Sequence, residues 1–310
     1  MALGSKTKTT AKTEAGKHLY VIDASIFIFR YYFSMPSNWF ASNGRPTETV
    51  YGYATWLLKF LTNEKACNVV ACFDESLMTC FRNEIYPDYK MSRALPDDDL
   101  AFQLLACKQL TQLLGVSSYA SDTYEADDLA GSFAKYCGKK NIPYTLLTRD
   151  KDLSQLLAFG ESCMWDYPDK TPIQHDDVTS LLGVKAEQVA DYLAIVGDAS
   201  DDIPGVPGVG PKTAIALLSA FGSWEKIKKH NNEISALPIR GAKTLQEKMI
   251  EYEAQVDMAL RLSTIATDGL KVTWRETKVQ ALELAALKDF CEALGFPASF
   301  MKKAGQLCES

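Results

Sequence analysis

Apolar positions along the chain follow two alternating patterns. Short apolar runs predict strands at residues 18–23 (HLYVID), 68–74 (NVVACFD) and 142–148 (IPYTLLT). Apolar residues at helical spacing predict helices at 46–63, 98–114, 124–140 and 152–159. Strands that alternate with helices are typical of an α/β fold with a mainly parallel central sheet flanked by helices. A Rossmann nucleotide site is the alternative for this architecture, but no GxGxxG follows the first strand.

Nine acidic residues lie in five clusters near the ends of these elements. They are Asp23, Asp74, Glu125, Asp127, Asp128, Asp150, Asp152, Asp198 and Asp201. Ligands of parallel sheets bind beyond the carboxyl ends of the strands, where three of these clusters fall. Carboxylates gathered there repel one another unless cations separate them, and Mg²⁺ prefers oxygen ligands. Two ions about 4 Å apart suit phosphodiester hydrolysis, because one activates water and the other stabilises the leaving oxygen.

Each cluster also has a simpler interpretation. A single Asp after a strand is more often the N-cap of a helix than a metal ligand, which applies to Asp23 and to Asp152. Glu125, Asp127 and Asp128 could favour a helix N-terminus electrostatically. The convergence of five clusters is what favours a pocket that binds divalent cations.

Composition limits the possible classes of protein. The 310 residues are 47% hydrophobic, which supports a packed core in one large or two modest domains. No apolar run approaches ~18 residues, so we expect no membrane span. Eight Cys without CxxC spacing and three scattered His predict buried thiols in a reducing compartment and no zinc site. Residues 1–17 read as a disordered basic tail, with a transit peptide as the alternative.

The net charge of −6 does not exclude a nucleic-acid partner. Without the nine clustered acids, 33 basic residues face 39 − 9 = 30 acidic ones, a balance of +3. Residues 80–97 interleave Arg82, Lys90 and Arg93 with aromatic side chains such as Tyr89, a pattern that suits phosphates and bases. A solvated basic loop is the alternative for this segment.

A glycine-rich loop lies between two predicted helices, 186–196 and 212–221. It reads DDIPGVPGVGPKT and runs from Asp201 to Thr213. Its glycines let backbone approach a phosphate, and Pro211 fits the first turn of the second helix. Helix–hairpin–helix elements hold duplex DNA in this way without reading its sequence. A plain helical hairpin is the alternative.

These motifs together resemble the bacterial 5′→3′ exonuclease and flap endonuclease family, which includes the 5′-nuclease domain of DNA polymerase I. The matching segments run in family order over about residues 19–222. They are IDASIFIFRYYF, GRPTETVYGY, FDES followed by FR, YPDYKMSR, YEADDLA, TRDKDLSQLL and GDASDDIPGVPGVGPKTA. The resemblance implies a free-standing PIN-like 5′ nuclease with a helical arch and a helix–three-turn–helix DNA-binding subdomain. It also implies two Mg²⁺ ions, with Mn²⁺ as a substitute, and DNA flaps or 5′ ends as substrate.

The resemblance also implies residue roles. The first metal would be surrounded by Asp23, Asp74, Glu125, Asp127 and Asp128, and the second by Asp150, Asp152, Asp198 and Asp201. Lys90 and Arg93 would contact the scissile phosphate from the arch, Tyr89 would stack near the threaded strand, and Arg82 would contact phosphate. The duplex-binding loop would use Gly205, Gly208, Gly210, Lys212 and Thr213, and its carbonyls hold a monovalent cation such as K⁺ in some members.

Two departures from the family pattern stand out. Asp202 replaces the usual Asn and adds negative charge near the metals. The run Asp97-Asp98-Asp99 follows the arch, where we expect it to cap the next helix and face solvent.

We expect four parts along the chain. They are the tail (1–17), a nuclease core (18–185) with the arch at about 80–97, a DNA-binding lobe (186–270) and a C-terminal segment that packs back on the core (271–310). A monomer in the bacterial cytoplasm is the expected state, with an organelle as the alternative. Other functions weighed are a catalytically idle protein that binds branched DNA and a PIN-type ribonuclease.

Overall fold

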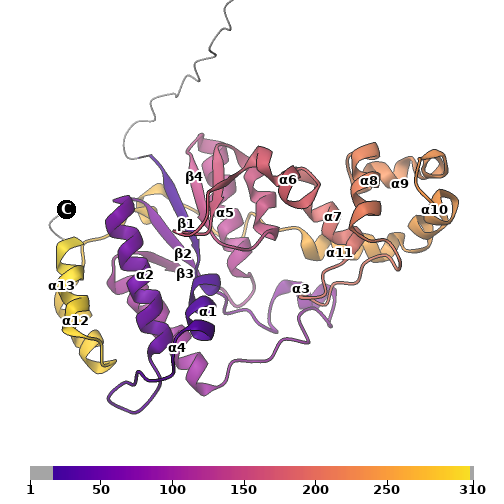
Figure 1. The fold of residues 1–310 in the computed structure, drawn as a ribbon. Helices are drawn as coiled ribbons and strands as arrows, with labels where there is room; N and C mark the ends of the chain where they lie inside the picture. Colours follow the sequence, from indigo (N-terminus) through magenta and orange to yellow (C-terminus); the bar gives the residue numbers. More distant parts are fainter. Residues whose placement is uncertain (1–16, 308–310) are drawn as a thin grey trace, which may run out of the picture.

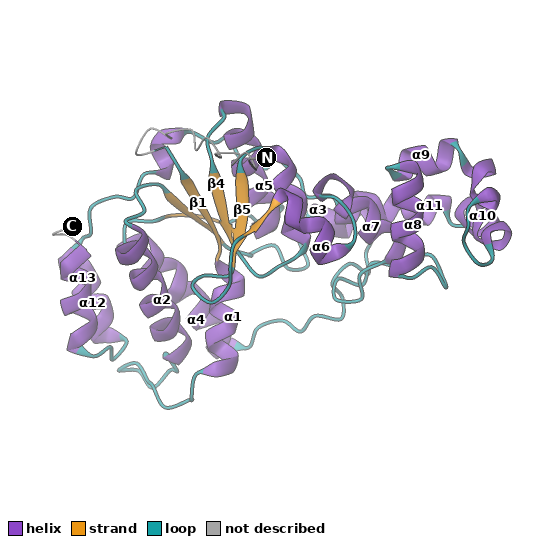
Figure 2. Ribbon diagram, turned by 45° about the horizontal axis from the view of Figure 1, so that its top comes forward, coloured by secondary structure: helices purple, strands orange, loops and turns teal. Residues whose placement is uncertain are grey.

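A six-stranded sheet forms the centre of the molecule in the computed structural model, which describes residues 17–307. The strand order is β3-β2-β1-β4-β5-β6, and only β6 pairs antiparallel to its neighbour. The strands are β1 (Leu19–Asp23), β2 (Val69–Cys72), β3 (Ser117–Tyr119), β4 (Tyr144–Leu147), β5 (Ser162–Trp165) and β6 (Ile173–Gln174). The predicted α/β class with a mainly parallel sheet is confirmed, and Figure 2 shows the sheet between its helices.

Both faces of the sheet are covered, which is why its central strands β1, β2 and β4 are largely apolar. Val21 and Val70 face one buried cluster, and Ile22 and Ala71 face the other. The second face packs against α1 (Ala24–Ser34), α2 (Glu48–Glu64) and α4 (Asp98–Leu113). The first face packs against α5 (Ala126–Lys140) and the 3₁₀ helix η1 (Asp152–Phe159).

The register of the central strands places the predicted acidic clusters at one edge. Asp23 is the last residue of β1 and lies opposite Cys72, two residues before Asp74. Ile22 lies opposite Leu147, three residues before Asp150. The carboxyl ends of β1, β2 and β4 therefore meet side by side.

A helical lobe extends from the sheet on the side of β4 and β5 (Figure 1). Short elements lead into it, namely η2 (His175–Asp177), α6 (Val178–Leu182) and η3 (Ala186–Gln188). Its helices are α7 (Val189–Val196), α8 (Pro211–Phe221), α9 (Trp224–Lys229), η4 (Asn231–Ala236), α10 (Ala242–Glu251) and α11 (Glu253–Ser263). Helices α7 and α11 pack on each other, and the apolar cluster of the lobe is continuous with that of α5.

The chain then returns to the opposite side of the sheet. After η5 (Trp274–Thr277), the helices α12 (Leu284–Ala293) and α13 (Ala298–Leu307) pack against α4 and α2 (Figure 1). The predicted tail lies outside the described residues, apart from Lys17. Among residues 17–307, no helix is both long and apolar enough to cross a bilayer.

The arch segment is less helical than the resemblance implies. Only α3 (Phe81–Ile85) is helical, and residues 86–97 form turns and irregular chain because Pro87 and Pro96 lack backbone N–H donors. Asp97 caps α4 through its side chain, which accepts from the Leu100 N–H at 2.8 Å, and Asp98 and Asp99 are exposed in the first turn. The predicted capping role of this acidic run is confirmed.

Candidate active site

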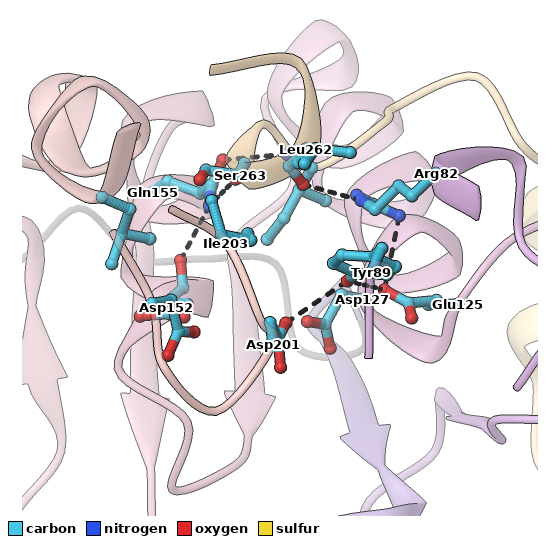
Figure 3. Close-up of a pocket in the computed structure, with 13 residues that line it drawn as sticks. Arg82, Tyr89, Glu125, Asp127, Asp152, Gln155, Asp201, Ile203, Leu262 and Ser263 are labelled. Carbon is cyan, nitrogen blue, oxygen red and sulfur yellow. Dashed lines mark hydrogen bonds and ion pairs between the residues drawn. The ribbon is translucent and has the colours of Figure 1, made fainter. Parts of the chain in front are cut away.

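A pocket of about 590 Å³ lies beyond the carboxyl ends of β1, β2 and β4. Eight of the nine predicted acids line it, namely Asp23, Asp74, Glu125, Asp127, Asp150, Asp152, Asp198 and Asp201. They come from five strand or helix termini, and the first and last of these acids, Asp23 and Asp201, are 178 residues apart in sequence. A smaller cavity of about 30 Å³ shares Asp127, Asp152 and Asp201 with this pocket, and Figure 3 shows the residues that line it.

Backbone and hydroxyl groups orient Asp23 and Asp74, whereas Glu125 and Asp127 lie at the start of α5. Asp23 accepts from Thr148 Oγ1 at 2.9 Å and from the Ile26 N–H at 3.5 Å, so it caps α1 as well as lining the pocket. Asp74 accepts from Ser25 Oγ at 2.9 Å and from the Ala126 N–H at 2.7 Å. The N-cap interpretation and the pocket interpretation of Asp23 therefore both hold.

The other four acids lie on two loops. Asp150 Oδ1 accepts from the Asp152 N–H at 2.9 Å in the loop between β4 and η1. Asp198 and Ile203 exchange backbone hydrogen bonds of 2.9 and 2.8 Å, which close a tight loop that carries Asp201. The two loops face each other across the pocket because α7 packs on η1.

Burial and mutual repulsion raise the pKa values of several of these carboxyls. Burial is the larger cause of the raised pKa of Asp152, to about 7, and Asp150, Asp198 and Asp201 add repulsion. The pKa values of Asp23 and Asp127 are raised for the same two reasons. The pocket thus holds more negative charge than its surroundings balance, and its oxygen-only donors fit a hard divalent cation.

Two arch cations reach into this pocket. Lys90 Nζ lies 2.7 Å from Glu125 Oε1 and 3.5 Å from Asp201 Oδ2. Arg93 Nη2 lies 2.5 Å from Asp201 Oδ1, and its side chain is 46% exposed. The backbone N–H of Lys90 also donates to the Asp201 carbonyl at 3.0 Å. The structure therefore brings Lys90 and Arg93 to the acids, at the mouth of the pocket.

Three predicted site residues lie elsewhere than the resemblance implies. The Arg82 side chain is 3% exposed and forms an ion pair with Asp128, which is fully buried. Tyr89 is also buried, and its hydroxyl donates to Glu125 Oε2 at 2.9 Å. Because α3 turns Arg82 inward and the fold buries Tyr89, neither side chain is open to a phosphate or a base here. The Asp128 carboxylate is paired with Arg82 in this structure, and we leave Asp128 out of the proposed ligands.

A second acidic group near the pocket is already neutralised. Cys80, Glu125 and Asp128 bring their donor atoms within 4.8 Å of one another, a spacing that suits a metal ion. Arg82 Nη1 lies 3.3 Å from Glu125 Oε2, 2.6 Å from Asp128 Oδ2 and 3.7 Å from the Cys80 sulfur. The guanidinium therefore takes the position that a cation would occupy.

The glycine-rich loop reaches the surface at the start of α8. Gly208 is exposed with φ of +74°, Pro211 opens α8, and Lys212 is exposed. A Cβ on Gly205 would lie 2.0 Å from the Val196 carbonyl oxygen, so this glycine is needed for packing. A Cβ on Gly210 would meet no atom within 4 Å, which leaves the backbone before α8 uncovered.

The sequence interpretation did not single out several pocket residues. Ser25, Phe29, Arg149, Lys151 and Tyr192 also line the pocket. Arg149 and Lys151 alternate with two of the acids in the segment TRDKD, and this alternation was the available signal. No sequence pattern marks Tyr192, because it lines the pocket only as a result of the packing of α7 on η1.

A mainly parallel sheet with a carboxylate pocket at its carboxyl edge, joined to a helical lobe, defines the PIN-like nuclease class of fold. The family model "5'-3' exonuclease, N-terminal resolvase-like domain" matches residues 18–188, and "5'-3' exonuclease, C-terminal SAM fold" matches residues 184–285. The chain belongs to the 5′–3′ exonuclease family.

Curated relatives agree with this assignment. The 5′–3′ exonuclease of Aquifex aeolicus is 31% identical over 274 residues, which cover 87% of this chain and 94% of the relative. DNA polymerase I of Bacillus subtilis is 35% identical over 261 residues, and the thermostable DNA polymerase I of Thermus filiformis is 34% identical over 284. The matched residues cover 82% of this chain but only 28% of the Bacillus polymerase, and 91% of this chain but only 33% of the Thermus polymerase.

Solved structures share the fold at low identity. The bacteriophage T5 5′-exonuclease with bound zinc ions has a TM-score of 0.64 at 19% identity, covering 94% of this chain and 98% of that one. The catalytic core of Rad2 in complex with DNA substrate has a TM-score of 0.57 at 16% identity, covering 94% and 91%.

Proposed function

We propose that this protein is a divalent-metal-dependent 5′ nuclease that hydrolyses DNA phosphodiester bonds. It would act as a 5′→3′ exonuclease, a structure-specific 5′ flap endonuclease, or both. The observation that carries the proposal is the convergence of eight carboxylates in one pocket with two arch cations at its mouth. Family membership supports the activity, as does the Rad2 core described with DNA substrate.

The pocket would hold two Mg²⁺ ions, and Mn²⁺ would substitute. Asp23, Asp74, Glu125 and Asp127 would bind the first ion, and Asp150, Asp152, Asp198 and Asp201 the second. Such ions supply charge neutralisation at the phosphoryl oxygens and activation of the attacking water. The bacteriophage T5 5′-exonuclease, which shares this fold and is described with bound zinc ions, supports the proposal of divalent binding.

Lys90 and Arg93 would act directly on the substrate. In this structure each pairs with a carboxylate that the proposal assigns to metal. When cations balance those carboxylates, the two side chains become available to the scissile phosphate and stabilise its developing charge. Arg82 and Tyr89 support this arrangement from within the protein.

The duplex would rest on the lobe. Gly208, Gly210 and Lys212 present backbone N–H groups and one ammonium at the start of α8, a geometry suited to phosphates. Thr213 follows in the first turn, where its own N–H donates to the Gly210 carbonyl at 3.0 Å. Lys248 Nζ already donates to the Pro207 carbonyl at 2.6 Å, so a K⁺ ion at this loop would compete with an ammonium. We propose a monomer of the bacterial cytoplasm, consistent with the bacterial relatives.

The test is cleavage of 5′-end-labelled and internally labelled DNA flaps with Mg²⁺, with Mn²⁺ and with EDTA. Metal-dependent release of an intact flap identifies the endonuclease, and release of mononucleotides identifies the exonuclease. Asp74→Asn should abolish either activity, whereas Asp289→Asn, an exposed change on α12, should leave it unchanged. An Asp74→Asn protein that cleaves at the wild-type rate would exclude the proposed site.

The same assay separates the alternatives. Tight flap binding in a gel shift without cleavage in any metal would indicate a catalytically idle protein that recognises branched DNA. Preferential cleavage of RNA flaps would indicate a PIN-type ribonuclease.

A further inference from the structure

The Arg82 guanidinium is a buried group with every N–H directed at an acceptor. Nε donates to the Leu262 carbonyl at 2.7 Å, and Nη2 donates to Asp128 Oδ1 at 2.8 Å and to the Thr264 carbonyl at 3.1 Å. Nη1 donates to Asp128 Oδ2 at 2.6 Å and to Glu125 Oε2 at 3.3 Å. A side chain that was expected to contact a phosphate is instead fully used inside the protein.

These bonds join three parts of the fold at one point. Arg82 lies in α3 at the base of the arch, and Glu125 and Asp128 begin α5. Leu262 and Thr264 belong to the end of α11, the last helix of the lobe. Asp128 strengthens the same junction, because its Oδ1 accepts from the Ala266 N–H at 2.8 Å and its Oδ2 from the Glu125 N–H at 3.1 Å.

The two oxygens of Glu125 consequently differ. Oε2 accepts from Arg82 at 3.3 Å and from the Tyr89 hydroxyl at 2.9 Å, both from within the protein. Oε1 faces the pocket, where Lys90 lies at 2.7 Å. Figure 3 shows Arg82 and Tyr89 on one side of the Glu125 carboxylate. Although burial opposes ionisation, Lys90 and Arg82 hold the Glu125 pKa below its ordinary value, so the carboxylate is charged.

We infer that Arg82 is a positioning residue that fixes Glu125 through Oε2, so that Oε1 alone is presented to a divalent cation. This inference rests on the proposed function, since it assumes that the pocket binds metal. Hydrogen bonds that orient a ligating carboxylate tune metal affinity, and their loss costs about 10–100-fold. Because Arg82 also holds two carbonyls of α11, the position of the lobe and the orientation of Glu125 are joined through one side chain.

Lysine cannot replace this geometry. A guanidinium presents a rigid planar fork of donors, whereas an ammonium is a compact charge with three donors. Arg82→Lys therefore keeps the positive charge that pairs with Asp128. Its three N–H donors cannot form all five hydrogen bonds that Arg82 makes to Glu125, Asp128 and the two carbonyls at the end of α11. Arg261→Lys is the matched control, because Arg261 is exposed on α11 and has no place in the proposed site.

The experiment is a titration of each protein with Mn²⁺ in the absence of DNA, followed by electron paramagnetic resonance. We expect Arg82→Lys to bind one Mn²⁺ about 10–100-fold more weakly, while the second ion and the Arg261→Lys control match wild type. In flap cleavage, the concentration of Mg²⁺ that gives half-maximal rate should rise while KM for the flap stays constant. A purely structural role would lower thermal stability and leave Mn²⁺ affinity intact.

A second variant covers the case in which Arg82→Lys does not fold. Asp128→Asn keeps the shape of the side chain but removes the charge that orients the guanidinium, so Mn²⁺ affinity should fall in the same direction by a smaller factor. Wild-type Mn²⁺ affinity in either folded variant would overturn the inference alone. A wild-type protein that binds no Mn²⁺ and cleaves no flap would overturn the proposed function instead.

Discussion

Two groups of buried carboxylates lie side by side in this protein, and they differ in what balances their charge. Asp128 is fully buried, and Arg82 provides a permanent internal cation at 2.6 Å. Asp127, its neighbour in sequence, lines the large pocket together with seven other acids and has no ion-pair partner among residues 17–307. Lys90 and Arg93 pair with two of those acids, Glu125 and Asp201, from a segment of turns.

This contrast gives a criterion for distinguishing carboxylates that form structural ion pairs from carboxylates that would bind a metal ion. Burying a charged carboxylate is unfavourable unless a cation pairs with it, and that cation is either a side chain of the protein or an ion bound from solution. Arg82 is such a side chain for Asp128, so this ion pair belongs to the core. In the pocket the charge is left unbalanced. Burial first, and repulsion between the carboxylates second, raise the pKa of Asp127 and Asp152, and a divalent cation would balance their charge.

Removing the permanent cation should have the largest effect on stability. Arg82→Met leaves Asp128 buried and unpaired, so we expect a loss of about 3–5 kcal/mol in the free energy of unfolding, measured with urea. Arg261→Met on the surface of α11 is the control. A loss no greater than that of the control would mean that Asp128 does not depend on this cation.

The unbalanced pocket should make the metal-free protein less stable as pH rises. Asp23, Asp127 and Asp152 hold protons more tightly in the folded chain than in the unfolded chain, where the pKa of Asp is about 3.9. Between that value and the pKa of Asp152 near 7, the folded state therefore binds more protons, and stability falls with rising pH. Thermal melts in EDTA should shift down by on the order of 5 °C from about pH 5 to about pH 8, and Mg²⁺ should reverse the shift.

A pH-independent melting temperature in EDTA would contradict this account of the pocket. So would a stabilisation by Mg²⁺ that is larger at the acidic end of the range, because protons and metal compete for the same oxygens.

Removing an arch cation should show whether Lys90, unlike Arg82, occupies a position that a metal ion can take. Lys90→Met frees Glu125 Oε1 and Asp201 Oδ2, so Mn²⁺ should bind the DNA-free protein about 3–10-fold more tightly, or about 0.7–1.4 kcal/mol. Cleavage should nevertheless fall, because the phosphate loses its cation. Unchanged Mn²⁺ affinity, measured against Lys288→Met on α12, would show that Lys90 does not compete with metal.

The smallest effect is expected at the family departure Asp202. Its side chain accepts from the Ser92 N–H at 2.8 Å, and its φ is +56°. Asn accepts the same bond and tolerates this backbone conformation, so Asp202→Asn should change cleavage and the Mg²⁺-to-Mn²⁺ preference by no more than about twofold. A larger change in metal preference would place Asp202 among the groups that act on the pocket.

Local patterns predict most of the core but miss the core helix α1 and the short edge strands. The strands at β1, β2 and β4 and the helices α2, α4 and α5 follow from apolar spacing, and each predicted range overlaps the observed element. Residues 152–159 form a 3₁₀ helix instead of the α-helix suggested by their spacing, and α1 was not assigned a helix although Asp23 caps it. The short edge strands β3 and β6 have three and two residues, too few for a period to be read.

Residue type and spacing are enough to predict the acids at strand ends, the basic–aromatic segment and the glycine-rich helix start, because these are local features. Which acid faces which cation depends on the folded chain, because it requires contacts between residues such as Arg82, Asp128 and Leu262 that lie far apart in sequence. Adjacent residues on α5 point in different directions, so Asp127 meets the open pocket while Asp128 meets a buried guanidinium.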